Sequence, residues 1–465
     1  MLRYDTILRD PVHGDIPLTR EELQVLDTPE MQRLRHVRQL GAAYLIYPGA
    51  QHSRFEHSIG TAHLATRMVE AVNQERDRLG DPRLDGYDAA ALRIIRLAAL
   101  VHDATHLPFG HNIEDQTGLL PRHDRPERFA RLFSTDTALG RVLARTGALP
   151  SVMSILAPEL VAEGDAAPAH WRALVSGTID ADMLDYLARD AMFTGLRLEY
   201  DPRIFGVFRV DRASQQLYVE MGRQGYLKEA VLSEVVRCLE ARYYFSERVY
   251  YHHAKIAAGS LVAKAVEVVL LEEAVSFEEL QASTDAGLFD LLQRAQIEDP
   301  RRRRDLDLYL EALHHRRLPK RAAVYPVYAN QGIQQELIDG FFGAGSADRR
   351  RKVEREMSEE LERRCGRRIP VMLYCPAGHM QLKQAKLLVH WPGTSGLSSL
   401  SDHADKAPRL ADLEASYPRM WKFYVHVLSD DLEELKAASA LCEEVFPQAV
   451  NVLQPESGNP FASRP

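Results

Sequence analysis

An apolar stretch from Ala89 to Val101 leads directly into the polar pair His102–Asp103. Its apolar residues recur at helical spacing, and breakers at Asp85–Gly86 and Pro108 flank it, so we predict a helix that ends near His102. Polar groups beside an apolar helix are costly to bury unless a ligand or an ion satisfies them. We therefore expect the fold to bring other polar side chains, or an ion, to this pair.

Histidines are concentrated around this helix. Of the 18 in the chain, those between residues 52 and 123 are His52, His57, His63, His102, His106, His111 and His123. A single buried histidine is more often a hydrogen-bonded core residue than a metal ligand, but this density, partly in a loop with proline and glycine, favours a functional site.

Two imidazoles and two carboxylates are our candidate ligands for a divalent metal: His57, His102, Asp103 and Asp182. Such a set suits Mn, Fe, Zn or Mg and leaves positions open for water and substrate. At a frayed helical end the adjacent His102 and Asp103 can converge on one ion.

A further helix is predicted shortly after residue 177. Asp182, Tyr186 and Asp190 fall at positions i, i+4 and i+8, so they line one stripe of it. Arg189 can pair with Asp185, four residues earlier. An amphipathic helix with several charges is common, and only its link to the histidine cluster marks this one as part of a site.

The fold class follows from the spacing of apolar residues, which is helical from about residue 20 to 270. Short β-branched and aromatic runs at 322–328, 369–374 and 422–427 predict a smaller C-terminal α+β lobe. Two runs contain a proline, Pro326 or Pro370, which favours edge strands or strand ends because proline donates no ladder hydrogen bond. A chain of 465 residues is too long for one ordinary core.

We predict four segments: a helical core at 1–270, a helical extension at 271–320, the α+β lobe at 321–453 and a disordered tail at 454–465.

Composition excludes several classes of protein. A net charge of −8 argues against a surface that coats nucleic acid, although local basic patches stay open. Four scattered cysteines without CxxC spacing give neither a disulfide framework nor a thiolate zinc site, and they fit a reducing cytoplasm. We see no signal core and no apolar run of about 18 residues, so we expect a cytosolic protein without a membrane span. Basic clusters at 301–304 and 349–352 are interpreted as solvated helix faces, with a phosphate-binding patch as the alternative.

The four candidate ligands resemble the H…HD…D metal-binding signature of HD-domain phosphohydrolases. The match is closer to the branch of deoxynucleoside triphosphate (dNTP) triphosphohydrolases, and it is carried by Asp10–Ile16, Leu26–Gly41, Tyr47–Gly60 and Asp180–Asp190. The resemblance implies that residues 1–270 form an HD-domain core. It also implies hydrolysis of dNTPs to nucleoside and triphosphate by a water that a divalent metal activates.

Further roles are implied by position in this resemblance. The positions assigned to the phosphates, sugar and base of the substrate are Gln39, Leu40, Arg54, Tyr186, Asp190, Arg242 and Tyr250. Those assigned to catalysis are His106 and His111, as proton donors to the departing 5′ oxygen, and His123 with Asp124, which would orient or assist. The chain departs from the branch at Ala104–Thr105, Met183, Ser246 and Tyr251.

Asp27, Gln32 and Arg35 match positions that bind guanine at an allosteric site in this branch. They predict activation by GTP or dGTP and a homo-oligomer, either a dimer or a tetramer. A capped helix start at Asp27 with a surface salt bridge is an equally good interpretation. Two other functions stay open: an HD-type nuclease or phosphodiesterase acting on single-stranded nucleic acid or another nucleotide, and a non-catalytic nucleotide sensor.

Overall fold

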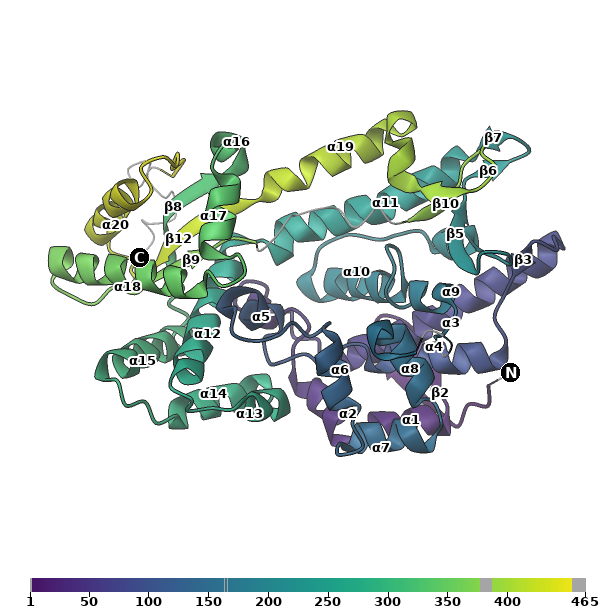
Figure 1. Ribbon diagram of the computed structural model, residues 1–465, viewed down its shortest axis with the longest axis horizontal. Helices are drawn as coiled ribbons and strands as arrows, with labels where there is room; N and C mark the ends of the chain where they lie inside the picture. Colours follow the sequence, from purple (N-terminus) through teal and green to yellow (C-terminus); the bar gives the residue numbers. More distant parts are fainter. Residues whose placement is uncertain (1, 163, 165, 377–386, 454–465) are drawn as a thin grey trace.

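The computed structural model describes residues 2–162, 164, 166–376 and 387–453, and the predicted tail at 454–465 lies outside them (Figure 1). The fold is mostly helical, with a smaller strand-containing region toward the C-terminus, as predicted. Within the described residues, every helix is too short or too polar to cross a bilayer.

Three helices in contact carry the candidate ligands. Helix α3 (Arg54–Leu79) begins at Ser53, which forms a capping box with Glu56. It packs against α4 (Ala89–Val101) and α10 (Ala181–Thr194) (Figure 1). The α4 helix ends where the sequence predicted, with His102 at its C-cap. The pair His102–Asp103 therefore lies where α4 ends, beside the helices α3 and α10 that carry the other candidate ligands.

A second contact brings α5 (His111–Thr117) against α12 (His253–Leu271). A Cβ added at Gly259 of α12 would lie 2.2 Å from the Asn112 side chain on α5. Only glycine permits this approach, so the two helices lie unusually close. Helix α12 also packs on α15 (Pro300–His314).

The predicted strands are present in one antiparallel sheet of order β8-β12-β9: β8 (Lys320–Pro326), β12 (Lys422–Val427) and β9 (Val371–Tyr374). Pro326 ends β8 and Pro370 precedes β9, and both strands lie at the edges of this sheet. The proline argument is therefore confirmed.

A five-stranded sheet of order β11-β10-β5-β4-β3 was not predicted. Its strands are β3 (Leu84–Asp85), β4 (Phe208–Asp211), β5 (Gln216–Glu220), β10 (Leu388–His390) and β11 (Leu397–Ser399). It joins residues beyond 387 to strands of the first half of the chain, and several of its strands are too short to leave a period-2 pattern. The boundaries of the four predicted segments stay a prediction.

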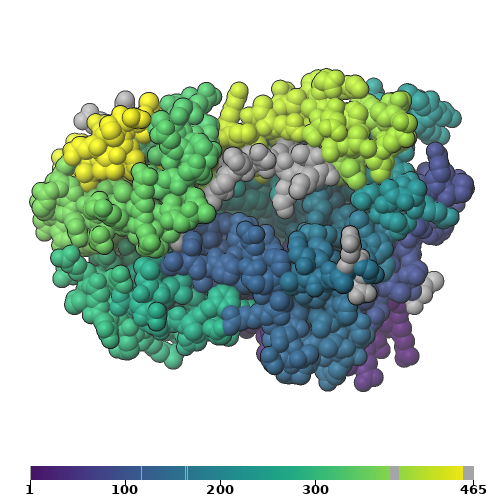
Figure 2. All heavy atoms as spheres, viewed as in Figure 1, coloured from purple at the N-terminus to yellow at the C-terminus, as the bar shows by residue number. Residues whose placement is uncertain are grey.

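The C-terminal residues, green to yellow in Figure 2, lie along one long side of the molecule over the blue and teal core. Helix α19 (Pro408–Ser416) packs on α11 (Glu229–Phe245) in this region. Two hairpins are formed by β1 (Thr6–Asp10) with β2 (Gly14–Leu18) and by β6 (Gly222–Arg223) with β7 (Tyr226–Leu227). Other helices are α1 (Arg20–Leu26), α2 (Pro29–Arg33), α6 (Pro126–Leu132), α7 (Ala138–Arg145), α8 (Leu149–Leu156), α9 (Ala169–Ala173), α13 (Phe277–Ala282), α14 (Asp285–Arg294), α16 (Val327–Asn330), α17 (Gln334–Phe341), α18 (Ala347–Cys365) and α20 (Leu432–Val445).

Candidate active site

The structure brings the four candidate ligands together from three helix ends. The Nε2 atom of His57 lies 2.9 Å from Asp182 Oδ1 and 3.8 Å from Asp103 Oδ2. His102 Nε2 lies 3.5 Å from Asp103 Oδ1 and 3.6 Å from Asp182 Oδ1. Neither Nε2 atom has a hydrogen-bond partner of acceptable geometry, although both are buried. Two unpartnered imidazole nitrogens that face two carboxylates fit a divalent cation.

The other ring nitrogen of each histidine is already held. His57 Nδ1 lies 2.7 Å from Asp185 Oδ2, and His102 Nδ1 lies 2.7 Å from the carbonyl oxygen of Ala99. Such contacts place the proton on Nδ1 and leave the Nε2 lone pair for a metal. The arrangement is that of metal-ligating histidines with their supporting acceptors.

The electrostatics of the site favour positive charge. Burial opposes protonation of His57, but the carboxylates of Asp182 and Asp185 outweigh it and raise the pKa of His57 to about 10. Burial also works against ionisation of Asp103, yet the neighbouring His106 and Arg54 hold its pKa well below the usual range. Arg54 donates to Asp103 Oδ2 at 2.6 Å.

A second histidine cluster adjoins the first. The rings of His106 and His123 stack with centroids 3.7 Å apart, and His111 packs edge-on against both. Burial, with the charges of Arg54 and His123, lowers the pKa of His106 to about 3, so its imidazole is neutral at neutral pH. The ligating atoms of these three histidines lie within 4.8 Å of one another.

His123 is supported by Glu114 and not by Asp124. Its Nδ1 and its backbone N–H lie 2.8 Å and 3.1 Å from Glu114 Oε2. Burial alone would raise the pKa of Glu114, but the contact with His123 and the nearby imidazoles hold it well below the usual range. Asp124 is exposed and lies 3.4 Å from Arg122, so its carboxylate is engaged with that arginine and not with the His123 ring.

All seven positions assigned to the substrate line one cavity of about 450 Å³, together with Asp103, Asp182 and the second histidine cluster. Tyr250 donates its hydroxyl hydrogen to Asp190 Oδ2 at 2.7 Å, and His52 contacts the other oxygen at 2.8 Å. Within the described residues, the Arg242 guanidinium makes no hydrogen bond or ion pair, and Gln39 Oε1 is buried without a partner. These unused polar groups indicate a site for a polar ligand.

The three positions assigned to an activating nucleotide lie outside this cavity. Asp27 is the exposed C-cap of α1, so it does not cap the following helix, which begins after Thr28. Arg35 donates to Gln32 Oε1 at 2.8 Å and stacks over Phe55 with its guanidinium 3.6 Å from the ring centroid. Binding of an activating nucleotide at this cluster stays a prediction.

Sequence reasoning did not foresee the supporting residues. Asp185 accepts hydrogen bonds from Arg189, as its i, i+4 spacing predicted, but it also contacts His57 and, at 2.6 Å, His13. The only signal for this role was the position of Asp185 in the aspartate-rich helix. Lys255 on α12 also lines the cavity and carried no signal.

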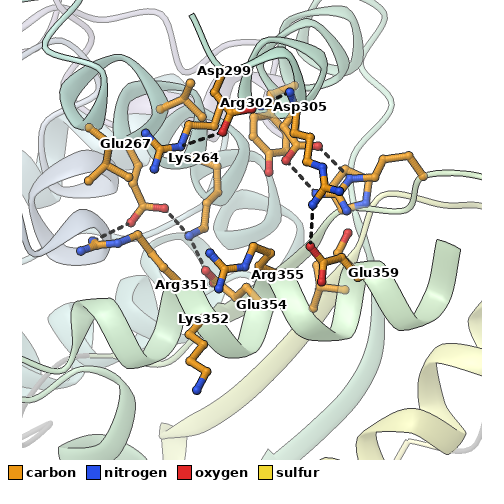
Figure 3. A pocket seen from close by; sticks show the side chains of 18 of the residues that line it. Lys264, Glu267, Asp299, Arg302, Asp305, Arg351, Lys352, Glu354, Arg355 and Glu359 are labelled. Carbon is orange, nitrogen blue, oxygen red and sulfur yellow. Dashed lines mark hydrogen bonds and ion pairs between the residues drawn. The ribbon is translucent and has the colours of Figure 1, made fainter. Parts of the chain in front are cut away.

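A larger cavity of about 690 Å³ lies between α12, α15 and α18 and contains none of the predicted site residues (Figure 3). The basic clusters at 301–304 and 349–352 both contribute to it. Its carboxylates are engaged, since Lys264 bridges Glu267 and Glu354 at its centre (Figure 3). Arg302 is paired with Glu272 and Arg351 with Glu267, whereas Arg350 is buried. The choice between solvated helix faces and a phosphate-binding patch stays a prediction.

Comparison with known families identifies two regions. The HD domain matches residues 54–150, and the HD associated region matches residues 224–440. The first contains three of the four candidate ligands, and the second contains Arg242, Tyr250 and Lys255. The cavity is therefore built from both matched regions.

Similar proteins include an uncharacterized protein of Methanocaldococcus jannaschii, 26% identical over 343 residues, which are 71% of this chain and 62% of that protein. Another is the uncharacterized protein YwfO of Bacillus subtilis, 32% identical over 269 residues, 57% of this chain and 55% of that one. Human deoxynucleoside triphosphate triphosphohydrolase SAMHD1 is 30% identical over 240 residues, 46% of this chain and 37% of its own. The match spans less than two thirds of each of these relatives.

A crystal structure of a hypothetical protein from Aquifex aeolicus, at 2.0 Å resolution, matches 94% of this chain and 99% of its own, with a TM-score of 0.63 and 21% identity. At that identity the likeness concerns the fold alone.

Proposed function

This chain belongs to the HD-domain phosphohydrolase family, and from that premise we propose that it hydrolyses dNTPs to nucleoside and inorganic triphosphate. The observation that carries the proposal is the pair of unpartnered Nε2 atoms on His57 and His102, which face two carboxylates at one end of a cavity with free cationic groups.

The metal would be held by the two imidazoles and two carboxylates described above. When bound, it supplies a more acidic water and neutralises negative charge on the phosphates. Manganese, magnesium, iron and zinc all accept this mixed nitrogen and oxygen set, so the donors alone do not select among them.

The substrate phosphates fit the cationic wall of the cavity. Arg242 has its full set of donors available within the described residues, and Arg54 has an unused Nε–H besides its bond to Asp103. A guanidinium grips phosphate oxygens in pairs, so these residues orient the triphosphate toward the metal ligands. Asp190 and Tyr250, which hydrogen-bond each other, would bind the sugar hydroxyl.

In the proposed reaction, water adds to the α-phosphorus and the bond from that phosphorus to the 5′ oxygen breaks. The 5′ oxygen then takes a proton, and His111 is our candidate donor because about half of its side chain is exposed in the cavity. A bound triphosphate would raise the pKa of His106 and His111, since nearby negative charge favours the protonated imidazole. Glu114 holds the neighbouring His123 in place.

The test is a product assay on each dNTP with protein loaded with Mn²⁺ or Mg²⁺. We expect nucleoside and triphosphate in equal amounts. Release of pyrophosphate or orthophosphate contradicts this reaction, and trimming of single-stranded DNA or RNA with intact dNTPs indicates the nuclease alternative. His102→Ala and Asp103→Ala should abolish turnover without unfolding the protein, since each removes a ligand and opens only a small space. Asp307→Asn, at an exposed side chain on α15, is the matched control.

A further inference from the structure

One part of the catalytic cavity has no role in the chemistry described above. It is lined by Asp115 of α5, by Tyr251 and Lys255 at the start of α12, and by Tyr374 of β9. Tyr251 packs against the small apolar cluster that contains Tyr374, and Asp115 and Lys255 line the same cavity. We call them the distal end of the cavity.

Lys255 has donors to spare at this end. Within the described residues, its one hydrogen bond goes to the carbonyl oxygen of Tyr250, at 3.3 Å. An ammonium group has three N–H donors and no acceptor. Burial, offset in part by the charges of Asp115 and Asp190, lowers the pKa of Lys255 to about 8. A partly desolvated donor of this kind forms a stronger hydrogen bond with a ligand than one in water.

The packing of α5 on α12 directs Lys255 into the cavity. Gly259 of α12 touches Asn112 of α5, and Lys255 lies one turn before Gly259 on the same face of its helix. Lys255 therefore lies on the face of α12 that is turned toward α5, and it lines the cavity that residues of both helices border.

The charge balance at the distal end favours a neutral ligand group. The cations Lys255 and Arg122 stand against the carboxylates Asp115 and Asp190, and Arg122 is already paired with Asp115 at 2.7 Å. A triphosphate would meet the carboxylate of Asp115 here, since Asp190 is already bonded to Tyr250 and His52. Arg54 and Arg242 supply the cations of the same cavity. Tyr251 and Tyr374 line this end of the cavity, and aromatic side chains are the kind on which a flat aromatic ligand stacks.

We infer that Lys255 reads the nucleobase of the substrate and favours a purine with a 6-carbonyl oxygen over one with a 6-amino group. The inference rests on the proposed function. The ammonium only donates, so a carbonyl oxygen satisfies it, while an amino group presents a second donor and leaves it unpaired. In this arrangement the base stacks on Tyr251 and Tyr374, and Lys255 distinguishes the 6-substituents by donating a hydrogen bond to the edge of the base.

The decisive comparison is between dITP and dATP, two purine nucleotides that differ at position 6 and at N1, which donates in dITP and accepts in dATP. We expect wild-type kcat/KM to favour dITP at least about tenfold, the size of one charge-assisted hydrogen bond. Lys255→Met should reduce the preference to about threefold or less, through a loss on dITP, while Lys255→Arg should keep the order. Lys352→Met, an exposed lysine on α18, is the control and should leave the ratio unchanged.

Equal wild-type rates for the two nucleotides, or an unchanged preference in Lys255→Met, overturn the inference and leave the proposed function standing. A binding measurement tests the role of Lys255 separately from turnover. Calorimetric titration of dITP and dATP into the full chain carrying Asp103→Asn, with and without Lys255→Met, makes the same comparison without turnover. Absence of hydrolysis by the wild-type protein counts against the proposed function. Equal affinities for dITP and dATP in this titration contradict the role of Lys255.

Discussion

Asp185 offers the sharpest test of the metal site because it supports a ligand without being one. It is fully buried, and its carboxylate contacts His57 Nδ1 at 2.7 Å, His13 Nε2 at 2.6 Å and two Arg189 nitrogens at 2.8 Å and 2.9 Å. Burial opposes its ionisation, but Arg189 and the histidine contacts keep its pKa well below the usual range. The substitution Asp185→Asn preserves shape and removes the charge.

The expected loss follows from hydrogen-bond capacity. An amide has one acceptor oxygen and an NH₂ group that only donates. It therefore cannot accept both on the side of Oδ2, which contacts His57 and Arg189 Nε, and on the side of Oδ1, which contacts His13 and Arg189 Nη2. If the NH₂ group faces His57, the ring proton moves to Nε2, and the lone pair needed for a metal is lost. Losing such a supporting partner weakens metal affinity about 10-fold to 100-fold, or about 1.4 to 2.7 kcal/mol.

Stability should fall less than for a fully broken pair. Arg189 keeps a second partner, Asp10, at 2.8 Å, so we take the lower end of the roughly 3 to 5 kcal/mol for breaking a buried ion pair. For 465 residues, with an unfolding entropy of about 2.1 cal/mol/K per residue, this lowers Tm by about 3 °C.

The assay is competitive Mn²⁺ titration against a metal buffer, with calorimetric melting of the metal-free protein. Asp307→Asn should match wild type in both measurements, because its side chain is exposed. A folded Asp185→Asn protein that binds Mn²⁺ within twofold of wild type would refute the reasoning from the His57 proton.

Three further outcomes are expected. Lys264→Met removes the cation between the buried Glu267 and Glu354, but Glu267 keeps Arg350 and Arg351, so we expect the lower end of the range, a loss of about 3 kcal/mol and a fall in Tm of about 3 °C. Lys352→Met should leave Tm unchanged, and equal melting curves for the two variants contradict this. His111→Ala should lower kcat about 10²-fold to 10⁴-fold with metal stoichiometry unchanged, and an unaltered kcat removes it as proton donor. If the exposed cluster around Arg35 binds an activator, GTP or dGTP should raise both the rate and the sedimentation coefficient, and Arg35→Ala should abolish both effects.

The helical core could be predicted because its signals are local. Breakers, caps and apolar spacing fix the ends of α4, so the position of His102 at a helix end followed from residues within a few turns. The sheet that joins β10 to β5 could not be predicted in this way. Its pairing of Val389 with Val219 is parallel and joins residues far apart in the chain, and β10 has only three residues.

The candidate ligands were found by type and density, whereas their supporting residues depend on tertiary contacts. His13 and Asp185 are separated by 172 residues and meet only once β1 and β2 are folded against α10. Glu114 was missed for another reason, since it carried no signal in the sequence and lies nine residues before His123. The hydrogen bond between His123 and Glu114 forms only because the chain that follows α5 turns back toward that helix.

The cavity explains why the residues after 270 belong to the function. Tyr374 and Tyr417 line it from the C-terminal half, and the Tyr417 hydroxyl lies 2.8 Å from that of Ser246. Ser246 is one turn beyond Arg242 on the adjoining helix, so this contact holds the segment that would present the guanidinium to the phosphates of the proposed substrate. The metal ligands lie in the first half of the chain, whereas both ends of the substrate would touch groups that the second half supplies or positions. Substrate selection in this fold is therefore able to change through residues such as Tyr374 while the metal chemistry stays as it is.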